Sequence, residues 1–115
     1  MPEPSADDIQ DSLNYLSGMC HGIAKSNGWY ESQRNAPELL ALIHSEVSEC
    51  LEAYRDGDQM SQKINGYREA TVELADVIIR VLDMAAFYGM DIGGAVMAKV
   101  RYNQTRPHRH GGKVY

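Results

Sequence analysis

The sequence predicts a single all-α domain built from four helices. Apolar residues recur at helical spacing in four segments, and no segment shows the apolar–polar alternation of a half-buried strand. The chain has 115 residues, near the usual size of one domain, so we expect a single domain over residues 1–115. Hydrophobic residues make up 43% of the chain, which excludes collagen-like and wholly disordered proteins.

The first predicted helix runs from about Ser5 to Ser26. Acidic residues soon after Ser5 are typical of a capped helix start, and apolar residues follow at helical spacing. Residues 27–30, Asn-Gly-Trp-Tyr, then break the pattern as a turn. We therefore expect residues 1–36 to form an N-terminal helix and turn.

The second predicted helix begins at Pro37, because proline is favoured in the first turn of a helix, and it continues to about Arg55. The third is expected over residues 67–88. Its apolar residues cover most of the helix circumference, so we expect this helix to be largely buried.

Asp91 supplies a cap for the fourth predicted helix, which is expected to reach about Tyr102. Residues 37–102 thus contain the three helices that are expected to carry the function. The last segment, residues 103–115, contains a proline and a glycine pair. We expect it to form an irregular, flexible and basic tail.

Charge is segregated along the chain. All 16 acidic residues lie at or before Asp91, together with six of the 11 basic residues, so this part carries a formal charge of −10 and the remainder +5. The acidic surplus disfavours a simple nucleic-acid binder, which needs basic residues to contact phosphates. It suits an anionic ligand that binds together with a divalent metal ion.

The remaining features indicate an ordinary intracellular protein. No apolar stretch approaches the roughly 18 residues needed to cross a bilayer. Cys20 and Cys50 form no paired framework, and the N-terminus shows no signal-peptide pattern, so a cytoplasmic location is expected. We interpret His21 and His44 as ordinary helix residues.

Two pairs of carboxylates stand out on the second and third predicted helices. Glu46 with Glu49, and Glu73 with Asp76, are each three residues apart, so each helix presents two carboxylates on one face. Glu46 falls inside the apolar arc of its helix, where an isolated carboxylate is costly unless a cation compensates it. Packed antiparallel, the two helices would bring four carboxylates together.

Four oxygen ligands, without a matching set of cysteine or histidine, favour Mg²⁺ or Mn²⁺ over zinc. The competing interpretation is a solvent-exposed acidic stripe, in which Arg80 pairs with Asp76 or Asp83. Arg80 therefore has two open roles, as a counter-ion for these acids or as a ligand for phosphate.

These motifs resemble those of the MazG-like all-α nucleoside triphosphate pyrophosphohydrolases, in particular the small, often phage-like members. Residues 45–49 are similar to the family pattern E-E-x-x-E, and residues 73–76 to E-x-x-D. Residues 99–113 resemble the family ending K-x-x-x-N-x-x-R-P-x-x-H-G-G-K. Ser45 departs from the pattern, because it replaces the first glutamate and leaves one acid fewer.

The resemblance implies Mg²⁺-dependent hydrolysis of a nucleoside triphosphate, with a dNTP as the expected substrate, to a monophosphate and pyrophosphate. Glu46, Glu49, Glu73 and Asp76 would hold Mg²⁺, with Mn²⁺ as an alternative ion. Glu46 and Glu49 would also be catalytic, with Glu49 orienting or deprotonating the attacking water.

The resemblance also implies substrate-binding residues at the end of the fourth helix and in the tail, where mobile cations would contact the phosphates. These residues are Lys99, Asn103, Arg106, His110 and Lys113. Lys99 and Asn103 are four residues apart, so they face one ligand. Trp29 either stacks on a nucleobase or fills the core between the first two helices.

We expect a homo-oligomer, either a dimer or a tetramer, because a short helical chain gains by packing against copies of itself and the family forms such assemblies. No nucleic-acid polymer and no membrane is expected as a partner. The resemblance places the protein in a bacterium or a phage-infected host cell.

Two alternatives remain open. One is a related all-α phosphohydrolase that acts on a nucleoside diphosphate or on phosphoribosyl-ATP. The other is a non-catalytic helical interaction module, in which the acids pair with a basic protein.

Overall fold

The computed structural model describes residues 2–106 and consists of four α-helices joined by loops. The helices are α1 (Ala6–Ser26), α2 (Ala36–Arg55), α3 (Glu69–Phe87) and α4 (Ile92–Gln104). The described residues contain no β-strand, only an isolated bridge between Met60 and Arg68 in the α2–α3 loop. The predicted all-α class with four helices is confirmed.

Side-chain caps fix three of the helix starts. Ser5 caps α1 and forms a reciprocal capping box with Asp8. The Asn35 side chain caps α2, which therefore begins at Ala36, one residue earlier than predicted. Asp91 caps α4, as predicted.

The end of α4 lies beyond its predicted boundary. Asn103 and Gln104 belong to the helix, so the first two residues of the predicted irregular tail are helical. His110 and Lys113, two of the predicted ligand-binding residues, lie outside the residues that the structure describes.

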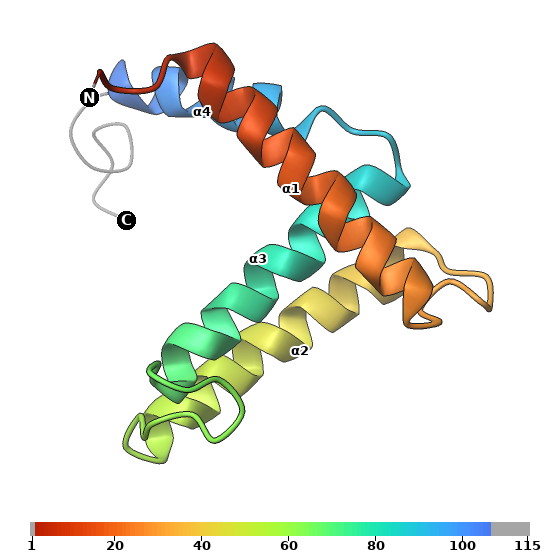
Figure 1. Ribbon diagram of the computed structural model, residues 1–115, viewed down its shortest axis with the longest axis vertical. Coiled ribbons are helices and arrows are strands. Elements are labelled where there is room, and N and C mark those ends of the chain that lie inside the picture. The colour runs from red at the N-terminus through yellow and green to blue at the C-terminus, as the bar shows by residue number, and fades with distance from the viewer. Residues whose placement is uncertain (1, 107–115) are drawn as a thin grey trace.

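The helices form two arms that meet at an angle (Figure 1). In one arm α2 and α3 run antiparallel side by side, and in the other α1 packs on α4. The arms meet where α1 crosses the C-terminal half of α3. There the buried Ser17 hydroxyl donates a 2.5 Å hydrogen bond to the Leu82 carbonyl oxygen. Helix α3 therefore belongs to one arm and contacts α1 of the other.

The α2–α3 arm leaves many apolar side chains exposed. Leu74 and Ile78 on α3 are 50% and 55% exposed, and Val47 and Leu51 on α2 are exposed to a similar extent. The prediction that α3 is largely buried is therefore wrong for the single chain. The physical reason is that α2 covers one side of α3 and α1 covers only its C-terminal half.

Helix length and composition also bear on membrane insertion. No helix within residues 2–106 is long and apolar enough to cross a bilayer. The longest, α1, has 21 residues and carries acidic side chains in its first turn.

Helix α4 lies close against α1 at Gly93. A Cβ atom at this position would lie 2.2 Å from the carbonyl oxygen of Gln10. Asn14 on α1 ties the contact together, because its side chain donates a hydrogen bond to Asp91 and accepts one from the Gly93 N–H, both at 2.8 Å. The contact therefore has no room for a side chain at position 93.

Gly93→Ala is expected to separate α4 from α1 and to lower the free energy of unfolding by roughly 1–3 kcal/mol, as overpacking does. The matched control is Gly22→Ala on α1, where an added Cβ meets no atom within 4 Å. This control should gain about 0.5–1 kcal/mol, because alanine favours a helix more than glycine. Urea unfolding measures both changes, and equal stability of the two variants would contradict the close contact.

Candidate metal centre

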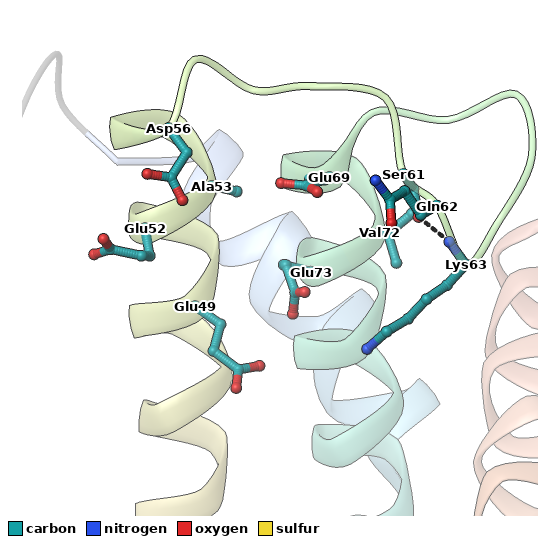
Figure 2. Close-up of a pocket in the computed structure, with 10 residues that line it drawn as sticks. All are labelled: Glu49, Glu52, Ala53, Asp56, Ser61, Gln62, Lys63, Glu69, Val72 and Glu73. Atoms are coloured by element: carbon teal, nitrogen blue, oxygen red, sulfur yellow. Dashed lines mark hydrogen bonds between the residues drawn. The ribbon is translucent and has the colours of Figure 1, made fainter.

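Three carboxylates from α2 and α3 lie close enough to share one ion. The side-chain oxygens of Glu46, Glu49 and Glu73 lie within 4.8 Å of one another, and we call these residues the carboxylate cluster. Glu46 and Glu49 are one turn apart on α2, and Glu73 faces them from α3. Figure 2 shows Glu49 and Glu73 extending into the gap between the two helices.

Two oxygens of the carboxylate cluster are buried without a hydrogen-bond partner. They are Oε2 of Glu46 and Oε2 of Glu73. Glu46 as a whole is only 7% exposed. A buried polar group left unpaired costs roughly 1–3 kcal/mol, and more when it is charged. Both oxygens are therefore suited to a cation that supplies the missing interaction.

Arg80 compensates only one oxygen of Glu46. Its Nε donates a 2.8 Å hydrogen bond to Glu46 Oε1, and its guanidinium carbon lies 3.8 Å from the centre of the Trp29 ring. Of its two predicted roles, this pairing fits that of a counter-ion. The partner differs from the predicted one, because Arg80 bonds to α2 across the helix interface and forms no ion pair with Asp76 or Asp83 on its own helix.

Asp76 lies beside the carboxylate cluster but is not part of it. Among residues 2–106 only the three glutamates form the close set of oxygens, so three of the four predicted ligands lie together. Burial, and next the charge of Glu46, raise the pKa of Asp76, whereas Arg80 and Lys63 act in the opposite direction. The influence of Glu46 indicates that Asp76 borders the same region.

Glu49 is the exposed member of the carboxylate cluster. The nearby carboxylate of Glu46 raises the pKa of Glu49, because the two groups favour a shared proton and repel each other when both are charged, and burial and Glu73 add to the shift. A carboxylate with a raised pKa is a stronger base at neutral pH. Its position at the edge of the cluster also leaves it accessible to water.

A cavity of about 410 Å³ opens beside the cluster, between α2, α3 and their connecting loop (Figure 2). Its volume lies within the range of roughly 300–1,000 Å³ that is usual for small-molecule sites. Most of its charged lining is acidic, and Lys63 is the one basic residue in it. The lining consists of Glu49, Glu52, Ala53, Asp56, Ser61, Gln62, Lys63, Glu69, Val72 and Glu73.

A second cavity of about 160 Å³ lies between α1, the turn after it and α3. Trp29, Asp76 and Arg80 line it, so it adjoins the carboxylate cluster from the other side. The Trp29 ring is half-buried, and Arg80 lies over one face of it. Stacking of Trp29 on a nucleobase stays a prediction.

A buried polar network that was not predicted joins α1 to α3. Asp83, which is 5% exposed, accepts a hydrogen bond from the Tyr30 hydroxyl and pairs with Nδ1 of His21, both at 2.9 Å. His21 lies within α1, as expected, and its ring also takes part in this network. Burial, and next the hydrogen bond to Asp83, raise the pKa of Tyr30. The only signal in the sequence was an acidic residue within the apolar pattern of α3.

The predicted ligands on α4 do not lie at the carboxylate cluster in the single chain. Helix α4 packs on α1 and makes no comparable contact with α2 or α3 (Figure 1). Lys99 and Arg106 lie near the ring of Tyr102, at 4.6 and 5.8 Å from its centre, and Asn103 is exposed. Their role in binding phosphate stays a prediction.

Comparisons of the chain with protein-family models, with curated proteins and with solved structures give no match. Membership of the MazG-like family therefore stays a prediction from the motifs. The converging glutamates and their two unpartnered oxygens are structural observations that do not depend on that resemblance.

The raised pKa values of Glu49 and Asp76 predict how stability depends on pH. The folded chain holds these protons above the ordinary carboxylate range of about 4, where the unfolded chain has lost them, so stability without metal falls as pH rises through this window. Mg²⁺ competes with the same protons, so it should raise the melting temperature more at about pH 7.5 than at about pH 5.

Thermal melts with and without millimolar Mg²⁺ at the two pH values measure this effect. Glu49→Gln should reduce both the pH dependence and the Mg²⁺ shift, because it removes one of the titrating groups. An Mg²⁺ shift that is the same at both pH values, or unchanged in Glu49→Gln, would exclude the proposed competition.

Proposed function

We propose that the protein is a Mg²⁺-dependent hydrolase that converts a nucleoside triphosphate, and specifically a dNTP, to a monophosphate and pyrophosphate. The observation that carries this proposal is the pair of buried, unpartnered oxygens of Glu46 and Glu73 within the carboxylate cluster. Hard oxygen ligands suit Mg²⁺, with Mn²⁺ as an alternative, and Mg²⁺ sites commonly leave positions for substrate phosphates. The motif resemblance supplies the reaction.

Glu46, Glu49 and Glu73 would hold the ion, with Asp76 as a further ligand from the edge of the cluster. When bound, Mg²⁺ neutralises phosphate charge and lowers the pKa of a coordinated water. Arg80 keeps Glu46 in place through its 2.8 Å hydrogen bond. Glu49 is accessible and has a raised pKa, so it is suited to accept the proton of the attacking water.

The reaction adds one water to the substrate. Its oxygen forms a bond to the α-phosphorus, and the bond from that phosphorus to the bridging oxygen of the β-phosphate breaks. The products are a nucleoside monophosphate and pyrophosphate. No nucleophilic side chain is needed, because positioning and charge neutralisation supply most of the catalysis in phosphoryl transfer.

The exposed apolar side chains of the α2–α3 arm support assembly into a homo-oligomer, a dimer or a tetramer. Burying apolar surface contributes about 25 cal/mol per Å², so side chains such as Leu51 and Ile78 favour a second copy that covers them. In such an assembly, the α4 residues of a neighbour would bind the substrate phosphates. Cys20 and Cys50 are both free, which fits a cytoplasmic protein.

Hydrolysis of a nucleotide panel with Mg²⁺, followed by separation of the products, tests this function. Pyrophosphate and a monophosphate are the expected products. Glu49→Gln should lower kcat by about 10²- to 10⁴-fold, because it removes a general base. Asp11→Asn, at an exposed carboxylate on α1, is the matched control and should retain activity.

Release of inorganic phosphate alone would instead favour the related phosphohydrolase that acts on a diphosphate. A chain that hydrolyses no nucleotide and shows no response to Mg²⁺ would favour the helical interaction module, for which the exposed apolar side chains are also suited.

A further inference from the structure

The loop between α2 and α3 is held in a defined shape by its own hydrogen bonds. The Ser61 N–H donates to the Tyr67 carbonyl oxygen at 2.8 Å and closes the loop. The Ser61 hydroxyl accepts hydrogen bonds from the N–H groups of Lys63 and Ile64, both at 3.1 Å. Arg68 donates to the carbonyl oxygen of Asp58 at 3.0 Å. These hydrogen bonds therefore hold the backbone of Lys63 in a defined position.

This loop brings Lys63 to the cavity of about 410 Å³ between α2 and α3, which we call the acidic cavity. Lys63 lines that cavity together with Glu49 and Glu73, and Figure 2 shows its side chain extending from the loop toward α3. Its positive charge opposes the rise in the pKa of Asp76 that burial and Glu46 cause, so Lys63 lies near the edge of the carboxylate cluster. Within residues 2–106, however, Lys63 forms no ion pair with any carboxylate.

The other nearby guanidinium is already engaged. Arg80 donates to Glu46 and lies over the Trp29 ring, so its planar group is held away from a ligand in the acidic cavity. Lys63 also lines the acidic cavity. Among the described residues, its ammonium group has no bonded partner. An ammonium group offers three donors on a flexible stem, which suits a phosphate.

A metal ion bound to the carboxylate cluster would change the charge that surrounds Lys63. A divalent cation held by Glu46, Glu49 and Glu73 would repel a lysine that lines the same cavity unless an anion lay between them. A phosphate that bridges the ion and the ammonium removes the repulsion and gains a charge-assisted hydrogen bond. The buried Oε2 of Glu46, which has no hydrogen-bond partner among the described residues, is the independent indication that a cation belongs there.

We propose that Lys63, on the α2–α3 loop, is a phosphate-binding residue that contacts the polyphosphate of the metal-bound substrate in the cavity beside the carboxylate cluster. This inference rests on the proposed function for the identity of the substrate. It does not rest on hydrolysis, because a metal–polyphosphate complex without a nucleoside tests the same contact.

The experiment compares wild type with Lys63→Gln and Lys63→Arg. Binding of inorganic triphosphate in the presence of Mg²⁺ is measured by calorimetry, and Mn²⁺ binding is measured alone. Lys63→Gln is expected to weaken triphosphate binding and raise the nucleotide KM by roughly tenfold to hundredfold, the effect of losing a charged hydrogen bond. Lys63→Arg should restore much of the loss. Lys25→Gln, at the exposed end of α1, is the matched control.

The alternative role for Lys63 is to compensate Asp76 without touching the ligand. In that case Lys63→Gln would leave triphosphate binding and KM unchanged and only tighten Mn²⁺ binding, which would overturn the proposal. Failure of the wild type to bind triphosphate with Mg²⁺ would overturn it as well. Triphosphate binding that depends on Lys63, in a chain without nucleotide hydrolysis, would support this contact while contradicting the proposed function.

Discussion

A buried carboxylate with only one compensated oxygen is the constraint on which the rest of this structure depends. Glu46 is enclosed between α2 and α3, and Arg80 satisfies its Oε1 but leaves Oε2 without a partner. Glu73 adds a second orphaned oxygen nearby. Such an arrangement is costly for an empty core and favourable for a metal site, because a cation supplies both missing interactions. The carboxylates between α2 and α3 therefore do not serve the stability of the fold, and the proposed metal site accounts for them.

Helix α3 links this site to the rest of the fold. It carries Glu73 in its N-terminal half and Arg80 in its C-terminal half, and Asp83 anchors it to His21 on α1 and to Tyr30 in the turn that follows. The same crossing places the turn after α1, with Trp29, against the Arg80 guanidinium. Arg80 thus contacts both Trp29 and Glu46. The α4 residues stand apart from this connected region in the single chain, which makes assembly with a second copy central to their predicted role.

Local signals were enough to predict the helices and most of the cluster. Caps at Ser5 and Asp91 depend on neighbouring residues only, and the three-residue spacing of Glu46 and Glu49 fixes their common face. The partners of Arg80 and Asp83 were not predictable, because they depend on the register of α3 against α2 and α1. The exposure of α3 was missed for a related reason, since an apolar pattern indicates a face to be buried but not which surface covers it.

Electron paramagnetic resonance of Mn²⁺ tests the central claim most directly, because the signal of the free ion disappears on binding. Titration of the wild-type chain should remove this signal in a saturable manner without any nucleotide. Glu73→Gln, which neutralises one of the two orphaned carboxylates, should weaken the saturation strongly. A free-ion signal that persists in the wild type, or that decreases equally in the variant, would show that the carboxylates do not form a metal centre.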